Sequence, residues 1–125
     1  MPTQNRDAIA NLARERRELA PATEKAFLAF SQQVFADGAL PAKMKQIIAV
    51  AVAHVTQCPY CIKGHTEAAL HHGSSPQELM EAIWVAAEMR AGAAYAHSAL
   101  AIDAIGQSEA DRWRRATRAG AELIG

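Results

Sequence analysis

The fold of this chain is decided by residues 41–65, which read PAKMKQIIAVAVAHVTQCPYCIKGH. Within this stretch, the segment from Ile47 to Val55 is apolar apart from His54, and its alanines let neighbouring helices approach closely. A helix that is apolar almost all round is usually buried on every side. We therefore predict a central helix here. In a chain of only 125 residues, we expect other subunits to supply part of its burial.

The rest of the chain has the same helical character. Alanine is abundant, and no alternating polar and apolar run is sustained, as a half-buried strand would require. Proline, glycine and capping residues divide the chain into about six predicted helices. These cover residues 5–19, 21–38, 41–56, 59–72, a long region from a capping box at 75–78 with a bend or break near Gly92, and a last helix from Ser108. We predict an all-α fold, a compact helical bundle that is oligomeric and forms one domain over residues 1–125.

The composition excludes several classes of protein. Thirteen basic residues balance thirteen acidic ones, so no basic excess indicates a nucleic-acid partner. The longest apolar stretch, Ile47 to Val55, is too short to span a bilayer, so we expect no membrane partner. The N-terminus has no signal-peptide hydrophobic segment. We therefore expect a cytoplasmic protein, in which a disulfide is more often catalytic than structural.

The motif that carries chemistry is CPYCIKGH at residues 58–65, which contains both cysteines of the chain. Pro59 suits the first turn of a helix, which places Cys58 at or just before the helix start and Cys61 in its first turn. His65 then lies one turn after Cys61 on the same face. The positive end of the helix dipole favours a thiolate, the reactive form of cysteine. We interpret Cys61 as the base-activated thiol and Cys58 as its resolving partner, while the opposite order stays open.

Three other interpretations compete with a redox pair. A structural disulfide is disfavoured, because so short a loop removes little entropy from the unfolded chain. Free cysteines also occur as small buried hydrophobic residues. A zinc site is the third, with His54, Cys58, Cys61 and His65 as ligands. On one straight helix these four would span roughly 16 Å and could not meet at one ion, but a break before Pro59 could bring the ends together.

The block from Leu40 to Lys43, together with the cysteine pair and His65, resembles the alkyl hydroperoxidase D-like branch of the carboxymuconolactone decarboxylase superfamily. The resemblance covers roughly residues 20–105. It implies an all-α fold that assembles as a homotrimer or homohexamer, and peroxide reduction without an organic or metal cofactor. Carried over by position, it makes Cys61 the peroxidatic thiol, Cys58 the resolving thiol and His65 the relay base. The lactone decarboxylases lack the cysteine pair, which argues against their reaction here.

The chain departs from this family pattern at one position. The relay of the family usually includes a glutamate twelve residues before the first cysteine, where this chain has Gln46. Either the relay is weakened or another carboxylate replaces the glutamate, and Glu88 is the best candidate for such a replacement. It lies in the mostly apolar stretch 84–89, where a buried carboxylate needs a partner. Glu88 should then lie within hydrogen-bond reach of His65, directly or through one water. The alternative is that Glu88 is an ordinary surface residue.

These residues lead to two functional hypotheses from different classes. The first is a thiol-dependent peroxidase or disulfide oxidoreductase, with a peroxide as substrate and an external dithiol as reductant. The second is a redox-sensing or assembly protein that uses the same cysteine pair without turnover, which the absence of the glutamate at Gln46 makes credible. A metal-binding module is a third possibility, which a metal assay would test.

Overall fold

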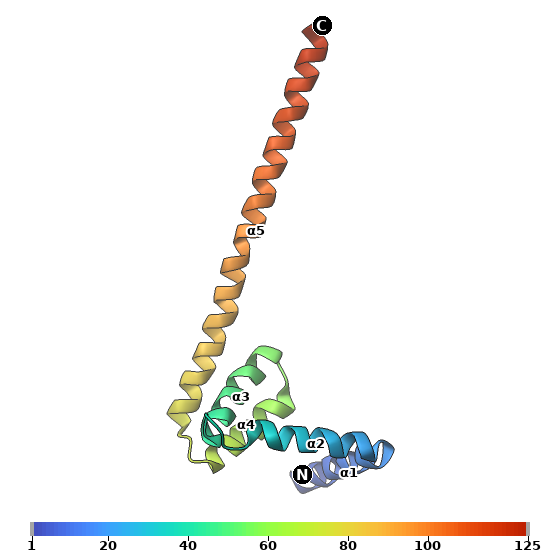
Figure 1. The fold of residues 1–125 in the computed structure, drawn as a ribbon, viewed down its shortest axis with the longest axis vertical. Helices are drawn as coiled ribbons and strands as arrows, with labels where there is room; N and C mark the ends of the chain where they lie inside the picture. The colour runs from blue at the N-terminus through green and yellow to red at the C-terminus, as the bar shows by residue number, and fades with distance from the viewer. Residues whose placement is uncertain (1, 125) are drawn as a thin grey trace.

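The computed structural model describes residues 2–124, and every regular element within them is a helix. The five helices are α1 Pro2–Leu19, α2 Pro21–Phe35, α3 Ala42–Thr56, α4 Pro59–His71 and α5 Pro76–Ile124. Helices α1 to α4 gather at one end of the molecule, and α5 rises from them as a long rod (Figure 1). The predicted all-α class is confirmed.

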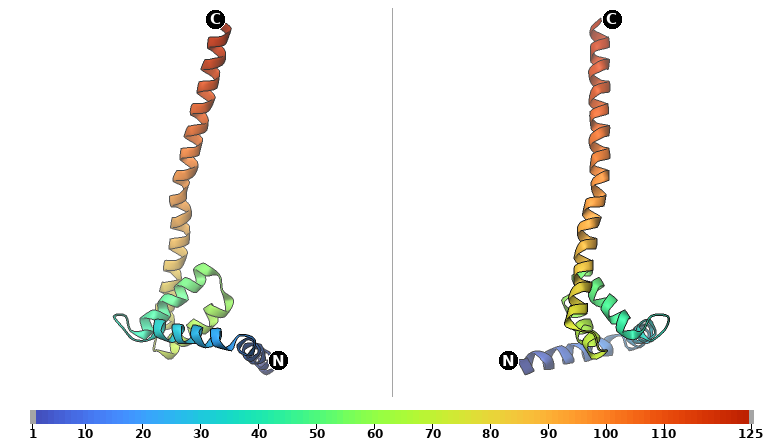
Figure 2. Two further views of the ribbon diagram at one scale, coloured as in Figure 1. Left: turned by 45° about the vertical axis from the view of Figure 1, so that its right-hand side comes forward. Right: turned by 90° about the vertical axis from the view of Figure 1, so that its left-hand side faces the viewer.

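The prediction of six helices in a compact bundle is wrong, because α5 runs through both predicted boundaries. It is continuous over 49 residues, without a break at Gly92 or a new start at Ser108. All five prolines of the chain lie at or next to a helix start, and none follows Pro76. Glycine and serine only weaken a helix interior, whereas proline removes a hydrogen bond and clashes with the preceding turn. Much of α5 therefore stands away from the other helices (Figure 2).

The core lies where α3 packs against α4 and α5. Val50 of α3 is fully buried and forms a cluster with Ala69 of α4 and Leu79 of α5. Ile47 and Ile83 pack against this cluster and are partly buried. Burial of such side chains is the main favourable contribution to folding, so this small cluster joins the three helices.

Helix α3 is buried on one face within its own chain, and the expectation that other subunits supply the rest of its burial stays a prediction. Its buried residues are Gln46, Val50 and Ala53, all on one face. Several of its other apolar side chains are exposed, namely Met44, Ile48, Val52 and Val55. The reason is that α4 and α5 cover only part of its circumference. Nor does any helix within residues 2–124 combine the length and apolar composition needed to cross a membrane.

The predicted capping box at the start of α5 is confirmed. The Glu78 backbone N–H donates to Ser75 Oγ at 3.1 Å, and the Ser75 backbone N–H donates to Glu78 Oε1 at 2.9 Å. The other carboxylate oxygen of Glu78 lies 3.3 Å from Lys43 Nζ, which links α5 to the first turn of α3. The Ser75 backbone N–H and then Lys43 stabilise the carboxylate, and together they lower the pKa of Glu78.

We expect Val50→Ala to destabilise the fold by about 2 kcal/mol, because it leaves a cavity where Ala69 and Leu79 meet. Val55→Ala removes the same atoms from the same helix at an exposed position and should change stability by less than about 0.5 kcal/mol. Urea denaturation followed by circular dichroism measures both free energies of unfolding. Equal effects of the two substitutions would contradict this account of the core.

The capping box should also make stability depend on pH. The folded pKa of Glu78 lies below its ordinary value near 4.5, so its contribution is fully present above that value and is lost as the pH falls through the folded pKa. Glu78→Gln should therefore lower the free energy of unfolding at pH 7, and the difference from wild type should shrink in acid. The neighbouring, exposed Glu81→Gln serves as the control and should show no such trend.

Candidate redox site

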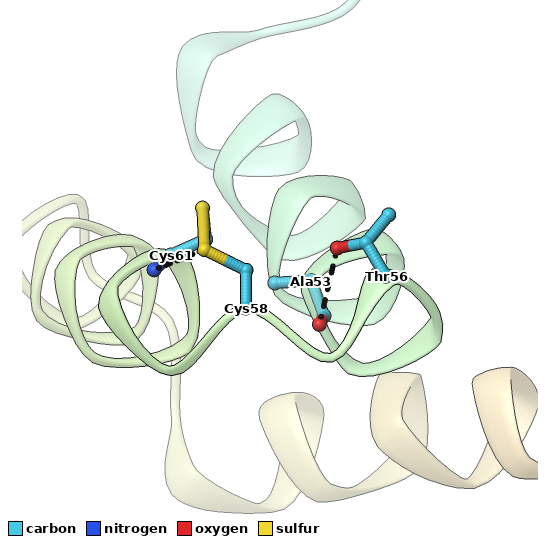
Figure 3. The surroundings of a disulfide bond; sticks show 4 residues. All are labelled: Ala53, Thr56, Cys58 and Cys61. Atoms are coloured by element: carbon cyan, nitrogen blue, oxygen red, sulfur yellow. Dashed lines mark hydrogen bonds between the residues drawn. A yellow bond between two sulfur atoms is a disulfide. The ribbon is translucent and has the colours of Figure 1, made fainter.

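The two cysteines form a disulfide at the start of α4 (Figure 3). Cys58 is the N-cap residue, with φ −98° and ψ 104°, and Pro59 occupies the first turn. Cys61 lies in the same turn, with its Cα 5.2 Å from that of Cys58. The helix start predicted from Pro59 is confirmed, and so is the expectation that the two thiols can close a disulfide across one helical turn.

A tight turn between α3 and α4 holds Cys58 in this position. Gln57 adopts a left-handed conformation, with φ 57° and ψ 44°, and caps α3 by donating its backbone N–H to the Ala53 carbonyl. The Cys58 backbone N–H donates to the same carbonyl at 3.2 Å. Thr56 Oγ1 also donates to it, at 3.4 Å (Figure 3). Three donors on one carbonyl close α3 and turn the chain directly into α4.

The sulfur of Cys58 caps the N-terminus of α4. The Cys61 backbone N–H donates to Cys58 Sγ at 3.2 Å. Helix N-termini favour negative charge, because their first N–H groups have no partner within the helix. When the disulfide is reduced, this contact favours the thiolate of Cys58 over the protonated thiol.

His65 is held by one residue from α3 and one from α2. Its Nδ1 lies 2.8 Å from Oε1 of Gln46. An amide oxygen can only accept, so Nδ1 carries the proton and donates it, which leaves Nε2 as the basic nitrogen. The ring stacks on Phe35, with centroids 5.1 Å apart and planes 25° apart. Two contacts therefore orient the imidazole.

Glu88 does not take the place predicted for it. It is exposed on α5, and within residues 2–124 no hydrogen bond joins it to His65. The expectation rested on its apolar neighbours, but Trp84, Val85 and Met89 are themselves exposed, so the carboxylate is not buried and needs no partner. Gln46, the residue in the place of the family's glutamate, itself occupies the position beside His65 where a carboxylate was expected.

A cavity of about 440 Å³ opens beside the site. Its lining combines Cys61 and His65 with mainly apolar residues from α2 and α3, including Val34, Phe35, Ile48, Ala49, Val52 and Ala53. A second hollow of about 490 Å³ also includes both Cys61 and His65, together with Gln46 and Tyr60. Cys58 lines neither space. Both cysteines are half-buried, and Cys61 is the one that lines these two spaces.

His54 does not join the cysteines as the zinc hypothesis required. Its Nδ1 lies 2.7 Å from the Val50 carbonyl oxygen of its own helix. In the part of the chain that the structure describes, no three or more histidine, cysteine and acidic residues are arranged to hold a metal ion.

Two residues that contact His65 were not predicted to belong to the site. Phe35 lies thirty residues before His65 in the chain, and nothing in its local sequence distinguishes it from a core phenylalanine. Gln46 was noted only as a departure from the family. Its position twelve residues before Cys58 could have identified it as the partner of His65, because an amide can accept the same hydrogen bond as a carboxylate.

Residues 21–104 match the model of the carboxymuconolactone decarboxylase family. The matched segment contains the disulfide, His65 and Gln46, and it covers well over half of the chain. The chain belongs to this family. The match is to the family as a whole, so membership of its alkyl hydroperoxidase D-like branch stays a prediction. The end of α5, residues 105–124, lies outside the match.

Relatives of this carboxymuconolactone decarboxylase family member occur in several bacteria. "Uncharacterized protein 4 in cox locus" of Paracoccus denitrificans is 67% identical over 75 residues, which make up 60% of this chain and 68% of that protein. A family member of Legionella pneumophila, solved as a crystal structure, is 34% identical with a TM-score of 0.61 over 67% of this chain and 74% of its own. A Thermotoga maritima family member, described with a possible involvement in an antioxidative response, is 28% identical with a TM-score of 0.50 over 52% of this chain and 67% of its own.

The hydrogen bond between Gln46 and His65 should control the reactivity of Cys61. Gln46→Leu removes the acceptor that orients the imidazole, and we expect alkylation of reduced Cys61 to slow by about 10-fold. Gln46→Glu supplies a charged acceptor that also stabilises the imidazolium, and should make alkylation faster than in wild type. Mass spectrometry after limiting iodoacetamide gives both rates. Gln33→Leu, at an exposed site on α2, is the matched control and should leave the rate unchanged.

Proposed function

We propose that this carboxymuconolactone decarboxylase family member reduces peroxides through Cys58 and Cys61, with an external dithiol as the reductant. The observation that carries the proposal is the disulfide at the start of α4, with Cys61 and His65 both lining one largely apolar cavity. The possible antioxidative involvement described for the Thermotoga maritima relative supports the same reading.

The first step of the proposed reaction takes place at Cys61. In the reduced protein its thiolate attacks the terminal oxygen of the peroxide, so a sulfur–oxygen bond forms and the oxygen–oxygen bond breaks. Cys61 is oxidised to a sulfenic acid, and the peroxide is reduced to an alkoxide or hydroxide that takes up a proton. His65 is the proposed proton carrier, because its Nε2 is free while Nδ1 donates to Gln46.

The second step closes the disulfide. The Cys58 thiolate attacks the sulfur of the Cys61 sulfenic acid, and hydroxide leaves and is protonated to water. The backbone N–H of Cys61, which donates to Cys58 Sγ, favours this thiolate. An external dithiol then reduces the disulfide by thiol–disulfide exchange and is itself oxidised to a disulfide. No organic or metal cofactor enters this cycle.

A second candidate function is redox sensing without turnover, and the Gln46 contact favours it. A neutral amide orients His65 but stabilises the imidazolium less than a carboxylate would. A weaker relay would slow the peroxide step while leaving the disulfide able to form. In that case the protein would report an oxidising condition through its Cys58–Cys61 disulfide, and the exchange with a reductant would reset it.

Peroxide consumption with dithiothreitol as reductant tests the proposal. Wild type should turn over many times, with cumene hydroperoxide and hydrogen peroxide as the two probes. Cys61→Ser should abolish consumption, because it removes the attacking thiol. In a separate reaction without dithiothreitol, which would itself reduce a sulfenic acid, Cys58→Ser should consume one equivalent of peroxide and leave a sulfenic acid at Cys61 that dimedone traps, detectable by mass spectrometry.

The two serine variants are matched controls for each other and also decide the order of attack. If dimedone labels Cys58 in Cys61→Ser while Cys61 stays unmodified in Cys58→Ser, the roles are reversed. A wild-type protein that forms the Cys58–Cys61 disulfide with peroxide but does not turn over would instead support the sensing function.

A further inference from the structure

Gln57, the residue between α3 and Cys58, has a backbone conformation that glutamine rarely adopts. Its φ of 57° and ψ of 44° are left-handed, and within residues 2–124 no other non-glycine residue has a positive φ. At the end of a helix this conformation usually belongs to glycine, because a Cβ is crowded there. Glycine would give the same turn without a side chain, so the contacts of the glutamine side chain are of interest.

The Gln57 side chain binds Arg90 of α5. A guanidinium group can only donate hydrogen bonds, so the amide of Gln57 turns its oxygen toward it. In this orientation Oε1 accepts from Nη1 of Arg90 at 2.8 Å and from Nη2 at 3.1 Å. Hydrogen bonds from a charged donor are stronger than those between neutral groups. Within residues 6–123 no carboxylate forms an ion pair with Arg90, which leaves the guanidinium to Gln57.

Arg90 reaches the turn from a part of α5 that is held by the core. It lies one helical turn after Ala86, which is buried, so the two residues share a face of the helix. The same helix carries Leu79 of the core cluster and packs against α3. Because this packing fixes the helix, the guanidinium has a defined position relative to the end of α3. The contact thus joins the turn before the cysteines to a helix outside the motif.

The conformation of Gln57 determines the position of Cys58, the next residue. Both donate their backbone N–H to the Ala53 carbonyl. Cys58 then leads from this turn into α4, where the disulfide joins it to Cys61 (Figure 3). If Gln57 left its left-handed conformation, Cys58 would lose its bond to the carbonyl and its place beside Cys61. The Arg90 contact and the disulfide therefore restrain the same turn.

We propose that Arg90 is a positioning residue of the redox site, which acts through Gln57 to keep Cys58 beside Cys61. The disulfide orders the turn that Arg90 binds, and Arg90 orders the turn that the disulfide closes. By linkage, the contact is stronger in the oxidised protein, and it makes the disulfide harder to reduce by the same factor. The inference requires that the two cysteines are redox-active, as in the proposed function, but not that peroxide is the oxidant.

The equilibrium with dithiothreitol measures this effect. In that reaction the protein disulfide gains two electrons and two protons and becomes two thiols, while dithiothreitol loses them and becomes its cyclic disulfide. Arg90→Leu should shift the equilibrium constant about 5-fold toward the reduced protein. This corresponds to about 20 mV, since a tenfold change is about 30 mV for two electrons. Acid quenching, alkylation and mass spectrometry give the two populations over a series of dithiothreitol ratios.

Variants of both partners separate positioning from a simple effect on stability. A contact equally strong in both redox states would stabilise the oxidised and reduced proteins alike and leave the equilibrium unchanged. Gln57→Leu should give the same shift as Arg90→Leu, and the double variant should show no further shift, because either substitution removes the one contact. Gln57→Glu keeps an acceptor for the guanidinium and should be at least as resistant to reduction as wild type. Arg112→Leu, at an exposed site further along α5, is the matched control and should not shift the equilibrium.

Three outcomes would overturn the proposal. The first is an equilibrium constant of Arg90→Leu equal to those of wild type and Arg112→Leu. The second is a shift of Arg90→Leu toward the oxidised protein. The third is a double variant in which the shifts of the two single variants add, which would show that Arg90 and Gln57 act separately. A wild type that fails to consume peroxide would contradict the proposed function but not this inference, because dithiothreitol is the only redox reagent used.

Discussion

The structure depends on the turn between α3 and α4, in which the Ala53 carbonyl accepts hydrogen bonds from Thr56, Gln57 and Cys58. This carbonyl lies at the end of α3, where it has no partner further along the helix. These three hydrogen bonds close the end of α3, and only Gln57 and Cys58 separate α3 from the start of α4. The two helices then pack against each other, and Ala69 meets Val50 in the core. The same turn makes Cys58 the N-cap residue of α4.

The chemistry of the site follows from this arrangement. Because α4 folds back against α3, His65 meets Gln46, nineteen residues earlier in the chain, and Phe35 of α2 covers the ring. The N-cap position gives Cys58 a backbone donor, while Cys61 faces the cavity. The two cysteines are neighbours with different surroundings, and this difference is what a reaction with one attacking and one resolving thiol requires.

Helix α5 combines two roles that its sequence does not separate. Its first turns pack against α3 and carry Leu79 and Ala86, which are buried. Its remaining length has the same alanine-rich composition, but residues 93–123 are exposed apart from half-buried Ala110 and Gly120. Composition predicts that both parts are helical, since alanine favours helix wherever it lies. It does not predict which part is buried, because burial depends on what the neighbouring helices can reach.

The sequence by itself determined the helices and the chemistry of the motif. Pro21, Pro59 and Pro76 predicted helix starts correctly, and the spacing of Cys58 and Cys61 predicted their disulfide, because both depend on contacts within one turn. Only the tertiary structure decided which part of α5 is buried and that Gln46, not Glu88, holds His65. Local rules place residues three or four apart, whereas a contact between separate helices depends on how those helices pack.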